Sequence, residues 1–334
     1  MDIGIDLGTA TVLIYINGEG IALSEPSVVA VNHKTGKVLS VGEEAYQMIG
    51  KTPAYISAVR PLQKGIVCDY KVTEEMIQYF IKKVCKDRLV KPRIAICVPS
   101  SITNVESNAV MDVALSAGAR KVFLIEEPVA AAIGAGIDIS QPNGNLIVDI
   151  GGGTTDIAVL SLNGIVNKTS VRTAGDSFSQ VIIRYIRLNH GVLIGESMAD
   201  QLKKEIGSVD YTEDKAMIAK GRSLITGLPR GVEITRSMLY PVLYNEGQQI
   251  AAAVKEVIEK TPPELVGDIS TNGIVMTGGG SLLDGIDRLL SQETRIPVRV
   301  AENAVECVAL GTGKSFLYLD TLVDGFVSPS TKKF

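Results

Sequence analysis

Several residue types that build common catalytic sites are scarce in this 334-residue chain. Tryptophan is absent, aromatic residues make up 5% of the sequence, and the two histidines are His33 and His190. Two isolated histidines argue against a histidine-based metal site and against a Ser-His-Asp triad. The cysteines lack CxxC or other metal-ligand spacing, so we expect reduced core thiols in the cytoplasm, at Cys68, Cys85, Cys97 and Cys307.

Long apolar runs are also missing. No window approaches the ~18 uninterrupted apolar residues of a membrane span. The first residues do not form a basic-then-apolar secretion signal, because a β-rich segment begins at Ile3. A net charge of −4 argues against a general binder of nucleic acid, although it is compatible with a local basic patch.

The composition that is present is that of a packed globular protein, with 46% apolar and 21% charged residues. The length suits about two domains. Short β-branched segments alternate with helical patterns, which is typical of α/β layers. The expected elements are a helix over 73–86 with Thr73 as its N-cap, a strand over 94–98, a helix over 104–117, a strand over 122–125 and a helix beginning near Pro128.

One acidic, glycine-rich turn occurs twice, as DLGTAT at residues 6–11 and as DIGGGTTD at residues 149–156. Each turn lies between two short β-rich segments, and the second of these runs into Asn-Gly, at 17–18 and at 163–164. Asn-Gly pairs favour type I′ hairpins, so each turn is expected to begin an antiparallel meander. This pattern predicts a duplicated domain, with one copy near 1–139 and the other near 140–311.

The last part of the chain has a helical pattern from 305 to 319, and we expect it to return to the first copy. Residues 320–334 are polar, and we expect them to be loosely held.

The repeated turn has the composition of a phosphate-binding loop. A strand followed by small residues lets several backbone N–H groups approach a phosphate, and hydroxyls add further donors, here on Thr9, Thr11, Thr154 and Thr155. Two such turns on paired domains predict a clamp that holds a polyphosphate from both sides.

The aspartates of these turns need a separate explanation, because a carboxylate beside a phosphate is repulsive. Mg²⁺ keeps several of its waters and bridges carboxylates to phosphate oxygens, so Asp6, Asp149 and Asp156 are candidates for largely water-mediated magnesium contacts. The alternative is that each aspartate only caps a turn.

Two other glycine-rich segments match known nucleotide motifs only in part. The GTGKS segment at 311–315 ends like a P-loop, but Val308 occupies the position of its first glycine. The segment Gly278–Gly280 lacks the third glycine of a dinucleotide fingerprint, because Leu283 stands there. It follows a strand over 274–276 and precedes a helix expected near Leu282, so it could offer a backbone surface to the nucleoside.

Together these motifs resemble the superfamily of actins, sugar kinases and heat-shock chaperone ATPases, and within it the MreB/Mbl family of bacterial actins. The resemblance extends over essentially the whole chain. It is carried by IDLGTA (5–10), EPSVVAV (25–31), RPLQKGIVCDY (60–70), IEEPVAAAIGAG (125–136), VDIGGGTTD (148–156), GLPR (227–230), TPPEL (261–265), TGGGSLLDGI (277–286) and VALGTG (308–313).

The resemblance implies an α/β, actin-like duplicated ATPase fold, in which two α/β domains surround a nucleotide cleft and each carries a smaller subdomain. Domain I would comprise residues 1–139 and 312–334, with its small subdomain at about 33–65. Domain II would comprise residues 140–311, with its small subdomain at about 179–244.

The resemblance also implies ATP and Mg²⁺ as cofactors, and roles for particular residues. Glu127 would orient the attacking water as the catalytic residue, although its neighbour Glu126 is equally acidic. Asp200 and Lys203, on a helix over 198–206, would reach the ribose and base. The other nucleotide-binding residues would be Thr9, Ala10, Thr11, Gly151, Gly152, Gly153, Thr154, Gly278, Gly279, Gly280 and Ser281.

Two positions depart from the family pattern. Many relatives read GTANT in the first turn, whereas this chain has Thr11 and Val12 in the last two places, which can alter phosphate affinity or hydrolysis rate. Asp200 replaces the more usual glutamate and shortens the reach to the ribose by one methylene.

The implied function is that of a filament-forming ATPase on the inner face of the cytoplasmic membrane, which organises cell-wall synthesis and sets cell shape. Its partners would be further copies of itself, an anionic membrane surface, and a transmembrane adaptor with wall-synthesis machinery of the RodZ, MreC and MreD type, without nucleic acid. In the segment 86–93, Leu89 and Val90 stand between basic residues and would contact the membrane. The alternative is an ordinary helix-to-strand loop.

Other members of the superfamily are alternative readings. A plasmid-segregating actin shares the ATPase motifs, and so do a heat-shock-type chaperone and a sugar or acetate kinase. A chaperone would need a substrate-binding domain, and we expect none after residue 320, where only a polar tail follows. A kinase would need a second catalytic base, and the sequence offers no candidate for it.

Overall fold

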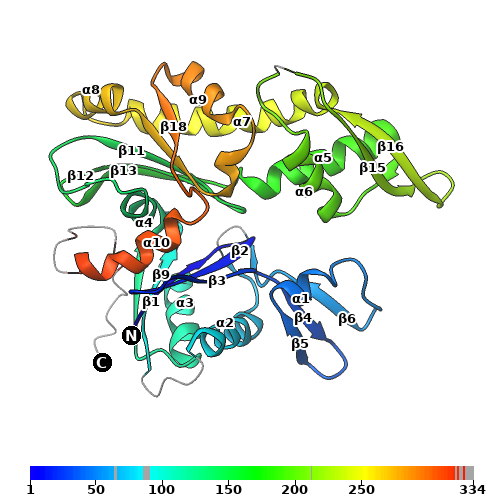
Figure 1. Cartoon of the computed structure of the whole chain (residues 1–334), viewed down its shortest axis with the longest axis horizontal. Helices are drawn as coiled ribbons and strands as arrows, with labels where there is room; N and C mark the ends of the chain where they lie inside the picture. The colour runs from blue at the N-terminus through cyan, green and yellow to red at the C-terminus, as the bar shows by residue number, and fades with distance from the viewer. Residues whose placement is uncertain (64–65, 86–90, 212, 320–321, 323–325, 328–334) are drawn as a thin grey trace.

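The computed structural model describes residues 1–334 except 64–65, 86–90, 212, 320–321, 323–325 and 328–334. Two large sheets lie one above the other in Figure 1, with helices packed on both. The first sheet has the strand order β19-β10-β9-β1-β2-β3. Its strands are β1 (Asp2–Leu7), β2 (Thr11–Ile16), β3 (Gly20–Pro26), β9 (Arg93–Val98), β10 (Lys121–Glu126) and β19 (Phe326–Val327).

The second sheet has the order β13-β12-β11-β17-β18. Its strands are β11 (Asn145–Ile150), β12 (Thr155–Ser161), β13 (Gly164–Val171), β17 (Ile274–Thr277) and β18 (Val298–Val300). Each sheet contains a three-stranded antiparallel meander followed by two parallel strands, so the second repeats the plan of the first. The duplication predicted from the repeated turn is confirmed at the level of sheet topology.

Two smaller three-stranded sheets stand beside the large ones, at the right of Figure 1. One contains β4 (Val29–Asn32), β5 (Lys37–Val41) and β6 (Ile56–Val59), next to the short helix α1 (Glu43–Tyr46). The other contains β14 (Val192–Leu193), β15 (Ala216–Ser223) and β16 (Pro229–Thr235). A two-stranded ribbon joins β7 (Leu62–Gln63) to β8 (Ile66–Val67).

The helices of the first half have local causes in the sequence. Helix α2 (Tyr70–Cys85) buries one apolar face that includes Met76 and Phe80. Thr73 was predicted as its N-cap, which is wrong: the Asp69 carboxylate accepts the Val72 N–H at 3.0 Å, and Thr73 lies buried in the first turn. Helix α3 (Asn104–Ser116) begins with a capping box between Thr103 and Glu106.

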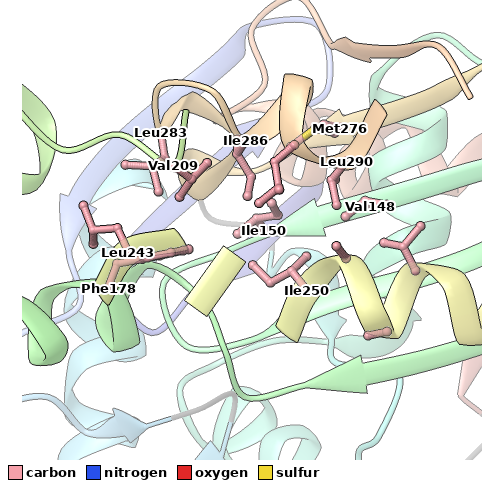
Figure 2. Packing of buried hydrophobic residues seen from close by; sticks show 14 of the residues in the cluster. Val148, Ile150, Phe178, Val209, Leu243, Ile250, Met276, Leu283, Ile286 and Leu290 are labelled. Atoms are coloured by element: carbon pink, nitrogen blue, oxygen red, sulfur yellow. The ribbon is translucent and has the colours of Figure 1, made fainter. Parts of the chain in front are cut away.

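The helices of the second half surround its sheet and the smaller sheet beside it. They are α5 (Gly175–His190), α6 (Glu196–Glu205), α7 (Arg236–Glu259), α8 (Pro263–Asn272) and α9 (Ile286–Thr294). Figure 2 shows side chains from α5, α7, α9 and the strands β11 and β17 meeting in one apolar cluster. None of the helices in the described ranges is long and apolar enough to cross a lipid bilayer.

Helices α4 (Glu127–Gly134) and α10 (Cys307–Lys314) cross between the two large sheets. They approach so closely that a Cβ on Gly311 would overlap the Ala130 carbonyl oxygen, and one on Gly134 would overlap that of Cys307. The GTGKS segment is therefore a packing element that also touches Gly4 of β1. The segment predicted as helical over 305–319 consists of α10 and a 3₁₀ turn, η2 (Ser315–Tyr318).

Both predicted hairpins exist, but neither has its type I′ turn on Asn-Gly. In the second, Leu162 and Asn163 hold the two central positions, with φ of 50° and 59°, one residue earlier than predicted. In the first, Ile16 pairs with Gly20, which leaves a three-residue loop. β-Bulges in both hairpins shift the register and move the turns.

Cys97 and Cys307 are buried, as expected of core thiols, whereas that expectation is wrong for Cys85, which is half-buried, and for Cys68, which is exposed. No disulfide joins any of them in the part of the chain that the structure describes.

Candidate functional site

The two glycine-rich turns lie against each other where the large sheets meet. A Cβ on Gly152 would be 2.8 Å from the Cβ of Ala10, so only glycine permits this approach. The Arg60 guanidinium donates to the carbonyl oxygens of Thr9 and Ala10, at 3.3 and 3.4 Å, and supports the first turn from behind. The structure thus brings together the predicted phosphate-binding segments 9–11 and 151–154.

The second turn is closed by its own backbone. The Gly151 N–H donates to the Thr154 carbonyl oxygen at 2.9 Å, and the Asp176 N–H at the start of α5 donates to the Gly152 carbonyl oxygen at 2.7 Å. The Thr155 hydroxyl donates to the Thr173 carbonyl oxygen at 2.7 Å. Thr155 was predicted to offer its hydroxyl to a phosphate, and this is wrong because the hydroxyl is buried and already used.

Four carboxyl groups gather at the strand ends beside these turns. Asp149 and Asp156 face each other across β11 and β12, with 3% and 0% of their surface exposed. Burial raises the pKa of Asp6 to about 6 and that of Asp149 to about 7, despite hydrogen bonds from Cys97 and Thr277. Burial and the charges of Asp156, Asp149 and Asp6 raise the pKa of Glu127 well above its usual range. The cluster therefore holds several acidic groups close together with little access to water.

Asp156 lies at the junction of the two large sheets. Its Oδ1 atom accepts the Ser100 N–H at 2.8 Å, although Ser100 follows β9 of the first sheet. The Glu127 carboxyl lies near Asp156, and burial together with the charge of Asp156 raises the pKa of Glu127.

The neighbours Glu126 and Glu127 have opposite surroundings. Both Glu126 carboxylate oxygens are 2.6 Å from the Lys168 ammonium, so this charge is neutralised. Glu127, at the first turn of α4, faces the aspartates instead. The position of Glu127 suits the predicted role beside a phosphate, whereas Glu126 is held in an ion pair.

The oxygen-rich donor set fits a hard cation such as Mg²⁺. In the described ranges, no three carboxylate, imidazole or thiol groups converge closely enough to hold one ion directly. Asp6, Asp149 and Asp156 would therefore hold Mg²⁺ through its waters, and the ion would neutralise charge between the carboxylates and a phosphate.

The Gly278–Ser281 segment forms a third backbone surface next to the second turn. Gly278 has a φ of 79°, and a Cβ there would overlap the Ile150 carbonyl oxygen. The Ser281 hydroxyl donates to the Gly278 carbonyl oxygen at 2.6 Å and so stabilises the turn itself. The helix predicted near Leu282 is instead a 3₁₀ turn, η1 (Gly279–Leu282), and α9 begins at Ile286, after Gly285 in the left-handed region.

Asp200 and Lys203 lie on α6 and form an ion pair at 2.8 Å. The Lys203 ammonium also donates to the Gly175 carbonyl oxygen and the Ser179 hydroxyl, both at 3.0 Å. Burial opposes ionisation of Asp200, but hydrogen bonds from Lys203 and Lys204 outweigh it and lower its pKa. These bonds hold both predicted ribose and base contacts near the second turn.

Four residues of this site were missed in the sequence. Cys97 donates to Asp6 at 3.2 Å and Thr277 donates to Asp149 at 2.6 Å, while Arg60 and Lys168 support the turns and Glu126. Cys97 is the last residue but one of β9 and Thr277 is the last of β17, and these strands run parallel to β1 and β11, so strand order could have identified both. Arg60 begins the family motif at 60–70, but only tertiary packing brings it to the first turn and Lys168 to Glu126, so neither role could be predicted from the sequence. Leu89 and Val90 lie outside the described residues.

Comparison with known proteins is consistent across sequence and structure. The family model described as MreB/Mbl protein matches residues 1–323. The cell shape-determining protein Mbl of Bacillus cereus is 49% identical over 323 residues, covering 96% of this chain and 97% of Mbl. The cell shape-determining protein MreB of Escherichia coli is 49% identical over 327 residues, covering 96% of this chain and 94% of MreB.

The fold comparison gives the same result. MreB5 of Spiroplasma citri bound to ADP has a TM-score of 0.90 and 38% identity, covering 94% of this chain and 95% of MreB5. The same protein bound to AMPPNP has a TM-score of 0.87. Both the fold and the sequence match over nearly the full length, so the chain belongs to the MreB/Mbl family of actin-like proteins.

Proposed function

We propose that this protein is an ATP-dependent, filament-forming bacterial actin that hydrolyses ATP with Mg²⁺ and helps to set cell shape. The observation that carries the proposal is the contact between the two glycine-rich turns, with four carboxyl groups beside them. ADP and AMPPNP are bound by MreB5, a relative with the same fold.

Each part of the site would have a separate role. Backbone N–H groups of segments 9–11 and 151–154 would bind phosphate oxygens from both sides, and the surface at Gly278–Ser281 with Asp200 and Lys203 would flank the nucleoside. Mg²⁺, when bound, would neutralise the phosphate charge. Glu127 would accept a hydrogen bond from the attacking water and align it.

Self-assembly is supported by an exposed apolar tip on the β15–β16 hairpin, made of Leu224, Ile225 and Leu228. These side chains are 46%, 87% and 65% exposed. Exposed apolar groups in one place often mark a protein interface, and we propose that a second copy covers this tip in a filament.

Membrane attachment is proposed at the segment 86–93, where Leu89 and Val90 are flanked by Lys86, Arg88 and Lys91. Apolar residues between basic ones suit an anionic lipid surface on the inner face of the cell membrane. A transmembrane adaptor and the wall-synthesis machinery would then act along the attached filament.

The catalytic proposal is tested with Glu127→Ala. We expect ATP hydrolysis to fall by roughly 10²-fold, the usual loss for a positioned acid–base group, with nucleotide affinity nearly unchanged. Phosphate release reports the first and a fluorescent nucleotide reports the second. Glu126→Gln is the comparison, because that carboxylate faces Lys168 and not the acidic cluster, so its change should reduce hydrolysis far less than the loss of Glu127. If Glu126→Gln is inactive and Glu127→Ala is active, the assignment is wrong.

A further inference from the structure

The corner where β10 becomes α4 is held by a cation from the other sheet. The Glu126 side chain is only 11% exposed and makes no capping bond to its own helix. Its carboxylate instead accepts two hydrogen bonds from Lys168 of β13, each at 2.6 Å. Without this ammonium, a nearly buried carboxylate would stand unpaired.

The strand register places Lys168 for this contact. On β13, Lys168 pairs with Ala158 and Ser170 pairs with Asp156. Residues two apart on a strand lie on the same face, so Lys168 and Ser170 share one side of the strand. Ser170 lies opposite Asp156 on the neighbouring strand, and Lys168 reaches Glu126 in the first sheet.

Two bonds therefore cross between the sheets near Glu127. One is the Lys168–Glu126 ion pair, and the other is the 2.8 Å bond from the Ser100 N–H to Asp156. Glu127 follows Glu126 in the chain, and Asp156 is close enough to raise the pKa of its carboxyl. A shift of the β10–α4 corner would move the Glu127 carboxyl directly.

We propose that Lys168 is a positioning residue for ATP hydrolysis: by anchoring Glu126 across the two sheets, it keeps Glu127 aligned with the acidic cluster and the phosphate turns. This inference rests on the proposed function. A displacement of about 1 Å of a reacting group can cost about 10²-fold in rate, so loss of the anchor is expected to reduce turnover without abolishing it.

The test compares Lys168→Met with Lys168→Arg in the full chain. For Lys168→Met we expect kcat to fall roughly tenfold, with nucleotide affinity within about twofold of the parent. Lys168→Arg keeps the charge and the reach, and it should retain activity within about twofold of the parent. Lys255→Met is the matched control, because Lys255 forms a comparable ion pair with Glu293 far from the site.

A double variant separates positioning from burial of an unpaired charge. Lys168→Met with Glu126→Gln removes both charges, so thermal stability should recover while kcat stays about tenfold low. Amide hydrogen exchange over residues 126–134 of the nucleotide-free protein should rise in both Lys168→Met proteins and not in Lys255→Met. Recovery of kcat in the double variant, or parental kcat and exchange in Lys168→Met, would overturn the inference.

Failure of the proposed function is distinguishable from failure of this inference. If Glu127→Ala hydrolyses ATP as fast as the parent, the catalytic proposal fails, and the role of Lys168 fails with it. If Glu127→Ala is inactive but Lys168→Met matches the parent, only the role of Lys168 is wrong.

Discussion

The acidic residues of the candidate site affect both its ability to bind a cation and the stability of the fold. Asp149 and Asp156 are buried at the strand ends, Asp6 and Glu127 are half-buried beside them, and in the described ranges no cation neutralises these four groups directly. Their raised pKa values show that the fold bears an electrostatic cost, which a divalent cation would relieve. Such a site is suited to binding rather than to stability.

Stability of the nucleotide-free protein should depend on pH through Asp6 and Asp149, with pKa values of about 6 and about 7 instead of 3.8. The folded state keeps protons that the unfolded chain releases. The contribution of these two protonated carboxyls to the free energy of unfolding is therefore complete below about pH 4, and it is lost as the pH rises through about 7. We expect Asp149→Asn to be more stable than the parent at about pH 8, by on the order of 2–4 kcal/mol.

Thermal melting between about pH 5 and pH 8 measures this effect. Because asparagine cannot ionise, the parent and Asp149→Asn should diverge as pH rises. Parallel melting curves for the two proteins would show that Asp149 is not the titrating group.

At the scale of elements, the crossing of α4 and α10 depends on backbone contact. Gly311 lies against Ala130, and Gly134 lies against Cys307, so no side chain separates the helices. The surrounding core includes residues from both large sheets, such as Ile125 of β10 and Ile147 of β11, together with Val308 of α10. This crossing joins the two halves of the molecule.

Gly311→Ala should therefore destabilise the protein by about 1–3 kcal/mol or more, because its methyl group would meet backbone that cannot move aside. Gly267→Ala is the control within α8, where a Cβ would have open space. It should be neutral or stabilise by up to about 1 kcal/mol through helix propensity. Urea unfolding measures both, and equal effects would contradict the packing argument.

The helices and strands could be predicted from the sequence more completely than the residues of the candidate site. Periodicity located most helices and strands, and the repeated turn predicted the duplicated topology that the sheets show. The turn at Leu162 was missed because a β-bulge shifts the register, a feature without a local sequence signal. Strand-end residues such as Asp149 could be predicted, whereas Lys168 could not, since only tertiary packing brings it to Glu126.

At the scale of the whole molecule, the apolar tip gives a test of assembly. Ile225→Glu places a charge where we expect a second copy to pack, and it should reduce the sedimentable fraction with ATP by at least about tenfold, since burying an unpaired charge is costly. Val105→Glu is the matched control at a side chain of 79% exposure on α3. Loss of sedimentation in both variants would point to general insolubility or unfolding instead of an interface.

Membrane attachment is tested by Leu89→Ser combined with Val90→Ser. Each apolar side chain contributes at most about 1.5–3 kcal/mol when fully buried, so one subunit binds weakly and a filament binds through many copies. The double variant should lose co-sedimentation with anionic liposomes and keep ATP hydrolysis. Neutral liposomes are the control, and parental binding by the double variant would exclude this segment as the anchor.

The crossing of α4 and α10 has a mechanical consequence. Two helices in backbone contact lose many contacts when they slide, but they can turn about their point of closest approach with less loss. The crossing would then act as a pivot between the two halves. The carboxyl cluster lies close to this pivot, and the β15–β16 hairpin lies far from it (Figure 1). A small rotation caused by a bound phosphate would move the hairpin tip much farther than the phosphate turns, so the nucleotide could control whether neighbouring copies fit together.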